Sequence, residues 1–155
     1  HLGNPSAQCV LHTHMPYATA VCAIDGGHLE WISQNSLRFY NCVAYEEEFD
    51  GLALDEAEGQ RIREKLAGGK ALFLANHGVI VTGPDVATAF DDLYYLERAC
   101  MIQVLAQSTG LPLKRIPDHV CRRTHEQFET ERQQASLHLE AIKRMLTREA
   151  PEFLE

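Results

Sequence analysis

The chain has 155 residues, of which 45% are hydrophobic and 23% charged, and these ordinary globular values exclude disordered and fibrous classes. Fourteen basic residues against 22 acidic ones give a formal net charge of -8, which argues against a nucleic-acid partner because phosphates require a basic face. No apolar run approaches the roughly 18 residues of a membrane span, so we expect no membrane partner. At about 150 residues per domain, the length predicts a single domain.

The five cysteines indicate a reducing compartment. Their number is odd, and no two have the C-x-x-C spacing of a zinc knuckle or a redox motif. Cys9, Cys22 and Cys100 have apolar neighbours, among which a free cysteine behaves as a small hydrophobic residue. We therefore expect buried, reduced thiols in a cytoplasmic protein and no catalytic thiol.

The first third of the chain predicts short strands around one small helix. Residues 9–11 (CVL) form an apolar run typical of a buried strand. A proline suits the first turn of the helix expected at 16–23, which Gly26-Gly27 ends. Residues 29–45 alternate loosely and are expected to hold one or two strands, and the acidic run at 46–48 is expected to be a solvated loop.

Three longer helices are predicted in the rest of the chain. The first begins at Asp55 and is closed by Gly68-Gly69. The longest spans about 85–107, where Glu97 interrupts an apolar stripe; a polar stripe is the simplest interpretation, and a place beside a site or an interface is the alternative. The last is expected over about 124–149 as one continuous amphipathic helix.

A β-hairpin is predicted between the first two of these helices. Residues 71–74 and 79–81 are two β-rich runs, and the turn between them carries Gly78, where we expect a positive φ. Strands that alternate with helices predict an α/β or α+β sandwich, with helices packed on a sheet.

Histidine residues near predicted strand ends suggest a metal site. His12 and His14 are two apart on a strand, so both imidazoles point to the same face, and neutral imidazole is a zinc ligand. The pair alone also fits one buried, hydrogen-bonded histidine and one surface histidine. His77 lies in the predicted turn, where a backbone hydrogen bond is the alternative role. Three histidines match a catalytic zinc site, which leaves a position open for water or substrate. Solvated or structural roles are expected for the histidines in polar contexts, namely His28, His119, His125 and His138.

Two blocks of this sequence resemble the class II aldolase/adducin family. Residues 10–20 (VLHTHMPYATA) resemble its metal-binding signature, and residues 76–79 (NHGV), with Gly83 and the helix AFDDLYYLERACMIQ, resemble its second block. The resemblance covers about residues 1–110. It implies an α/β fold, a three-layer α-β-α sandwich whose central mixed, largely antiparallel sheet is flanked by helices. The metal ligands implied by this resemblance, for Zn²⁺ or another divalent metal, are His12, His14 and His77.

The resemblance implies a metal-dependent aldehyde-lyase of carbohydrate metabolism, and usually a homotetramer with active sites between subunits. Such an enzyme cleaves a C–C bond of a small sugar or sugar phosphate, with zinc stabilising the enediolate as a Lewis acid. Epimerases and dehydratases of the family act on ketose phosphates with the same three histidines. The adducin head is a non-catalytic oligomerising module in which the metal set is broken. Because this chain keeps all three histidines, an enzyme is favoured.

Two parts of the family's site are not found in this chain. The family's proton-transferring glutamate is expected four residues before the histidine that resembles His1, and so upstream of this chain, together with the glycine-rich phosphate-binding segments. The family's proton-donating tyrosine aligns best with Gln34 or its neighbour. The metal site is therefore better supported than aldol cleavage, and we expect this segment alone to be inactive.

The same resemblance also implies a domain organisation. Residues 1–155 are expected to form one class II aldolase/adducin-like domain without its N-terminal part, and about 118–155 to form a C-terminal helical extension. The spacing between His1 and His12 is about four residues shorter than usual, which predicts a break in the chain within residues 2–5.

Overall fold

The fold is described from a computed structural model, which covers residues 4–49, 51, 56–131 and 133–154. The predicted chain break within residues 2–5 falls partly outside this set, and the predicted helix start at Asp55 lies outside it. In chain order the elements are β1 (Cys9–Thr13), α1 (Pro16–Cys22), the 3-10 helix η1 (Ser36–Phe39), β2 (Val43–Glu46), α2 (Glu56–Leu66), β3 (Ala71–Leu74), β4 (Gly78–Gly83), α3 (Val86–Gln107), α4 (Asp118–Thr130), α5 (Gln133–Glu149) and the 3-10 helix η2 (Pro151–Leu154).

The four strands form one mixed sheet in the order β1-β4-β3-β2. β4 pairs antiparallel with both β1 and β3, whereas β2 and β3 are parallel. The predicted hairpin is therefore confirmed. Within 29–45 the structure has the helix η1 and the beginning of β2, and β2 continues to Glu46, so this glutamate ends a strand and does not lie in a loop.

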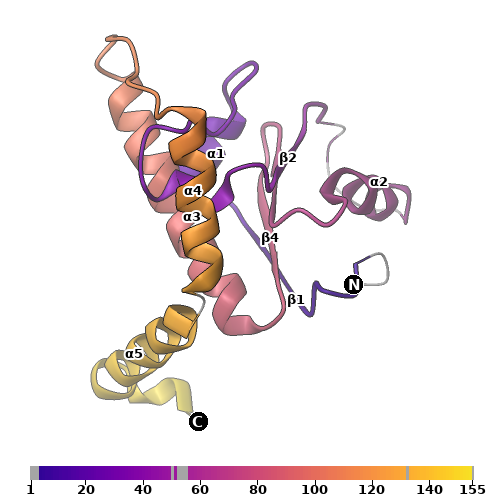
Figure 1. Ribbon diagram of the computed structural model, residues 1–155. Helices are drawn as coiled ribbons and strands as arrows, with labels where there is room; N and C mark the ends of the chain where they lie inside the picture. The colour runs from indigo at the N-terminus through magenta and orange to yellow at the C-terminus, as the bar shows by residue number, and fades with distance from the viewer. Residues whose placement is uncertain (1–3, 50, 52–55, 132, 155) are drawn as a thin grey trace.

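Helices cover both faces of the sheet (Figure 1). Alternate side chains of β3 and β4, such as Phe73 and Val79, pack with α1 and α3 in one core cluster. Their neighbours Leu72 and Ile80 point to the opposite face and pack with α2. This period-two alternation is that of a sheet buried on both sides. The predicted α-β-α sandwich with a mixed, largely antiparallel sheet is confirmed.

The longest helix, α3, begins where the sequence predicts it. The Asp85 side chain accepts a hydrogen bond of 2.7 Å from the backbone N–H of Thr88, which caps the first turn. Leu96 and Ala99 on its inner face are buried in the cluster shared with α1 and the sheet. α3 thereby holds α1, and the chain entering α1, against the sheet.

The single helix predicted over 124–149 is wrong, because two helices, α4 and α5, occupy this region. α4 starts earlier, at Asp118, directly after Pro117, which lies at the N-cap position. α4 packs on η1 through Cys121 and Phe128, whereas α5 packs on α3, where His138 lies against the ring of Tyr94. The two apolar faces meet different partners, so one straight helix does not satisfy both, and α5 lies apart from α4 in Figure 1.

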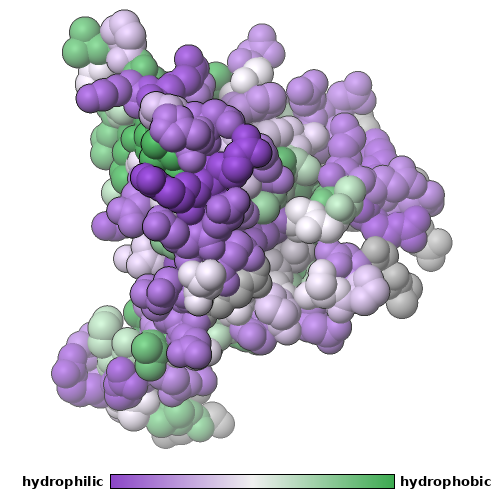
Figure 2. Space-filling model, in the orientation of Figure 1, coloured by the Kyte–Doolittle hydropathy of each residue, from purple (hydrophilic) through white to green (hydrophobic). Residues whose placement is uncertain are grey.

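No helix in the described part of the chain combines the length and apolarity that crossing a bilayer requires. Polar residues cover most of the face shown in Figure 2, with scattered apolar residues at the upper left and on α5. The exposed apolar side chains of α5 are Leu137, Met145 and Leu146.

Candidate metal centre

Three histidines meet at one end of the sheet because of its strand order. β1 lies antiparallel to β4, so the end of β1 is beside the start of β4. His12 lies opposite Ile80 near the end of β1, and His14 follows this strand by one residue. His77 lies in the turn that connects β3 to β4. The topology thus brings two histidines together with a third one that is more than sixty positions away in the sequence.

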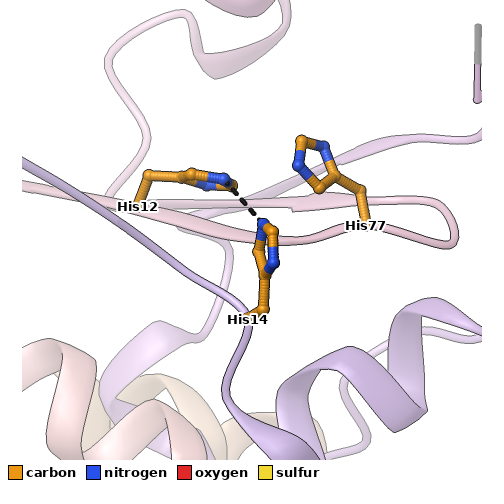
Figure 3. A group of neighbouring side chains, drawn as sticks. All are labelled: His12, His14 and His77. Carbon is orange, nitrogen blue, oxygen red and sulfur yellow. Dashed lines mark hydrogen bonds between the residues drawn. The ribbon is translucent and has the colours of Figure 1, made fainter. Parts of the chain in front are cut away.

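The three imidazole rings point toward one another (Figure 3). Their centroids are 4.9 Å apart for His12 and His14, 4.9 Å for His12 and His77, and 4.7 Å for His14 and His77. One nitrogen from each ring lies within 4.8 Å of the other two. Tetrahedral zinc with Zn–N contacts of about 2.1 Å separates its ligand nitrogens by roughly 3.4 Å. The donor set therefore fits a divalent metal after small side-chain adjustments.

The backbone contact of His12 selects the tautomer of its neutral ring. Its Nδ1 lies 3.1 Å from the carbonyl oxygen of Val79, which can only accept a hydrogen bond, so Nδ1 donates. The neutral ring then presents a lone pair at Nε2, and this atom lies 3.1 Å from Nε2 of His14. A hydrogen bond of this kind orients a metal-binding imidazole and selects its tautomer.

The turn that carries His77 depends on two small residues in different ways. The positive φ falls on Asn76, at 54°, and not on Gly78, so that part of the prediction is wrong. Gly78 is instead needed for space, because a Cβ there would lie 2.5 Å from the carbonyl oxygen of Thr13 and 2.8 Å from Cδ2 of His14. The backbone N–H of Asn76 also donates to the carbonyl of Cys22, which ties the turn to α1.

Glu97 supports the segment that follows His14. Its carboxylate oxygens accept hydrogen bonds from the backbone N–H groups of Tyr17 (3.0 Å) and Ala18 (2.8 Å), in the first turn of α1. These N–H groups have no partner within their own helix, and a carboxylate there is favourable. The only sequence signal for this role is a charged residue within an otherwise apolar stripe of α3.

A polar pocket of about 370 Å³ lies next to the turn that carries His77, and Asn76 forms part of its lining. Its lining includes Asp25, His28, Tyr45 and Asn76. The hydroxyl of Tyr45 accepts a hydrogen bond from the backbone N–H of Leu29, and burial raises the pKa of Tyr45 to about 12, so its hydroxyl remains protonated at neutral pH. No sequence signal predicts that Tyr45 lines a pocket.

The sequence matches the family model described as the Class II Aldolase and Adducin N-terminal domain over residues 1–104. A candidate class 2 aldolase of Pseudomonas aeruginosa is 37% identical over 120 residues, covering 77% of this chain and 46% of that protein. The decarboxylase NovR of Streptomyces niveus is 33% identical over 128 residues, covering 83% and 47%. Human beta-adducin is 34% identical over 111 residues, covering 71% and 15%. The chain thus spans about half the length of the first two relatives.

Solved structures show the same fold. An aldolase II superfamily protein from Pseudomonas syringae superposes with a TM-score of 0.84 at 35% identity, covering 97% of this chain and 60% of that one. The L-fuculose 1-phosphate aldolase from Glaciozyma antarctica superposes with a TM-score of 0.76 at 24% identity, covering 90% and 53%. The sandwich with histidines at one sheet end is a class II aldolase-type fold. This chain belongs to the class II aldolase/adducin family.

Proposed function

We propose that this chain carries the metal-binding half of a zinc-dependent class II aldolase-type lyase, which cleaves a C–C bond of a small sugar or sugar phosphate. The observation that carries the proposal is the convergence of one nitrogen each from His12, His14 and His77 within 4.8 Å. Family membership and the similarity to a candidate class 2 aldolase support it. Bound zinc, or another divalent metal, supplies Lewis-acid polarisation of a substrate oxygen.

The chain's own residues prepare this site for the metal. The contact of His12 with the Val79 carbonyl holds its ring with Nε2 toward the site. The turn at Asn76 directs His77 toward the other two rings, and Glu97 fixes the start of α1 behind His14. Proton transfer is assigned in this proposal to a glutamate upstream of His1 in the full-length protein.

We also propose the domain organisation and the oligomeric assembly that the family resemblance implies. Residues 1–155 belong to one aldolase/adducin-like domain, to which about 118–155 add a C-terminal helical extension. The assembly is a homotetramer with active sites between subunits. The five cysteines are free, which is consistent with a cytoplasmic location.

Decarboxylation is a second candidate reaction, because NovR is named a decarboxylase. Loss of CO₂ next to a carbonyl and cleavage of a C–C bond both leave an electron pair that must be stabilised, so one metal centre can serve either. Epimerase and dehydratase reactions on a ketose phosphate have the same requirement. A non-catalytic oligomerising module, as implied by the similarity to beta-adducin, has no need for the three histidines.

Metal analysis of the full-length protein tests the proposal. Protein purified at neutral pH without chelator should contain about one divalent ion per chain, and His77→Ala should lose it, since two imidazoles bind zinc far more weakly than three. His119→Ala, on an exposed position of α4, is the matched control and should retain the ion. Absence of metal from the wild type, or an unchanged zinc content in His77→Ala, would refute the metal centre.

Activity assays then separate the candidate reactions. Release of an aldehyde from a panel of ketose phosphates supports the lyase, whereas CO₂ release from hydroxy or keto acids supports the decarboxylase. A metal-loaded protein that oligomerises and turns over neither panel would contradict the lyase and favour a binding module.

A further inference from the structure

Cys42 and His125 meet at the other end of the sheet from the three histidines. Cys42 directly precedes β2, and its carbonyl accepts a hydrogen bond of 2.8 Å from the backbone N–H of Lys70, just before β3. His77 follows the end of β3, so the length of this strand separates the two places. His125 comes from α4, in the C-terminal part of the chain.

The side chains of Cys42 and His125 form a thiol–imidazole pair. The Sγ atom of Cys42 lies 3.6 Å from Nε2 of His125. Nδ1 of His125 lies 3.3 Å from the carbonyl oxygen of Leu37, which only accepts, so Nδ1 is the donor. In the neutral ring Nε2 therefore carries a lone pair, and the Cys42 thiol donates to it. This is the geometry in which an imidazole can remove a thiol proton.

The helix that carries His125 is held firmly in place. Cys121 and Phe128 of α4 pack with Leu37 and Tyr40 in one cluster. The Tyr40 hydroxyl donates a hydrogen bond to the carboxylate of Asp118 at the first turn of α4. The position of α4, from which His125 reaches Cys42, is thus fixed by this packing and by the hydrogen bond at its first turn.

Cys42 differs from the four other cysteines. Burial raises the pKa of the Cys22 thiol to about 11 and also raises the pKa of Cys100 and Cys121, which keeps these thiols protonated. Cys9, on the edge strand β1, is partly exposed like Cys42, so the prediction of a buried thiol at Cys9 is wrong. Among the described contacts, Cys42 alone has an imidazole as a hydrogen-bond partner.

Ionisable groups from three segments of the described chain lie near the pair. Tyr40 faces the His125 ring with centroids 6.5 Å apart. Lys70, whose backbone contacts Cys42, forms an ion pair of 2.5 Å with Glu129, one helical turn after His125. The charges of Lys70 and Glu129 offset each other, which leaves the imidazole of His125 as the group in direct contact with the thiol that can accept its proton.

We propose that Cys42 is a modification site, a nucleophilic thiol activated by His125 and oxidised by hydrogen peroxide. The thiol proton passes to Nε2 of His125, and the thiolate sulfur attacks one peroxide oxygen. An S–O bond forms as the O–O bond breaks, so the sulfur is oxidised to a sulfenic acid and the peroxide is reduced. The departing hydroxide takes the proton from His125 and leaves as water.

Alkylation kinetics test the nucleophilicity of Cys42. The full-length protein is treated with iodoacetamide at pH 6.5, and peptide mapping by mass spectrometry gives a rate for each cysteine. Cys42 should react about three- to tenfold faster than Cys9, because pairing with the imidazolium raises its thiolate fraction at this pH. Equal rates for Cys42 and Cys9 would overturn the proposal.

His125→Asn isolates the contribution of the imidazole. Asparagine can keep a donor toward the Leu37 carbonyl but has no atom at the position of Nε2. The variant should slow Cys42 to the rate of Cys9, while the exposed control His119→Asn should not change it. An unchanged Cys42 rate in a folded His125→Asn protein would contradict the proposal. If this variant does not fold, the wild-type comparison of Cys42 with Cys9 decides.

Peroxide gives the second readout. After brief treatment with about one equivalent of hydrogen peroxide, dimedone should trap a sulfenic acid at Cys42 ahead of Cys9. Trapping at both cysteines to the same extent, or at neither, would count against an activated thiol. Both readouts are independent of metal content, so they remain valid if the proposed metal centre is wrong.

Discussion

At the candidate metal centre, Gly78 allows the two segments that bear the histidines to come together. Its φ is outside the left-handed region, so conformational freedom is not what this position requires. A Cβ would instead collide with the carbonyl oxygen of Thr13 and with the ring of His14. Because glycine has no side chain, the end of β1 and the turn that carries His77 can lie this close together.

Gly78→Ala should lower stability and metal binding together. The added methyl group must push the end of β1 away, at a cost of about 1–3 kcal/mol in the free energy of unfolding. The same shift displaces His14, so zinc affinity should also fall. Urea denaturation and zinc titration measure the two effects.

The matched control for this substitution is Gly59→Ala. Gly59 lies in α2, where a Cβ meets no atom within 4 Å, and alanine there should stabilise the protein by about 0.5–1 kcal/mol. A Gly78→Ala protein as stable as the wild type would show that the two segments can separate freely.

The sequence predicted those site residues whose signals are local. His12 and His14 are two positions apart at the end of an apolar run, and His77 stands in a turn between two apolar runs, so each has a recognisable context. Glu97 acts on backbone groups 79 and 80 positions away, and Cys42 meets His125 across 83 positions. Nothing in the neighbouring residues of such pairs indicates the partner, because packing of α3 and α4 on the body of the fold creates the contact.

At the scale of elements, the segment after α1 is joined to α3 and to the segment before α4. Gln103, a buried residue of α3, accepts from the backbone N–H of Glu30 and donates to the carbonyl of His28. The Glu30 carboxylate accepts two hydrogen bonds from Arg115, at 2.8 and 2.7 Å. The hydrogen bonds to Arg115 lower the pKa of Glu30 below its usual 4.5.

Removing Arg115 should destabilise the protein in a pH-dependent way. Because the folded-state pKa of Glu30 is lowered, the stabilisation is present above its unfolded pKa of about 4.5 and is lost as pH falls through the folded value. Arg115→Met should therefore lower the urea midpoint at pH 7, and the difference from wild type should shrink below pH 4.5. Arg123→Met, an exposed position on α4, is the control, and its effect should not follow this pH profile. A deficit for Arg115→Met that persists unchanged at pH 3 would contradict the assignment.

The type and order of the helices and strands could be predicted from the sequence more accurately than the residues at which they begin and end. The runs at 71–74 and 79–81 and the stripe at 85–107 have strong periodicity, and the structure has β3, β4 and α3 there. The stripe expected at 124–149 is composed of two apolar faces, one for η1 and one for α3. Periodicity alone does not show where the apolar face begins to pack on a different element. The division into α4 and α5 therefore becomes visible only in the tertiary contacts.

At the scale of the whole molecule, α5 is attached to the body of the fold mainly through α3. The carboxylate of Asp91, which is only 4% exposed, accepts from Nδ1 of His138 at 2.7 Å and from Arg38 at 2.6 Å. The Arg38 guanidinium also lies 4.1 Å from the centre of the Tyr95 ring. One buried carboxylate thus joins η1, α3 and α5.

His138→Ala should release α5 and leave the sheet intact. Asp91 would keep its ion pair with Arg38, so the core retains its compensated charge, whereas α5 would lose its charge-assisted hydrogen bond. Such a bond contributes about 1.5–3 kcal/mol, so amide exchange within α5 should accelerate at least about tenfold. Leu137→Ala, at a position that is 70% exposed, is the control and should leave exchange unchanged. Equal acceleration of amide exchange in β3 and β4 would contradict this prediction and would mean that α5 and the sandwich unfold as one cooperative unit. Unchanged exchange in α5 would mean that its other contacts with α3 hold the helix in place without His138.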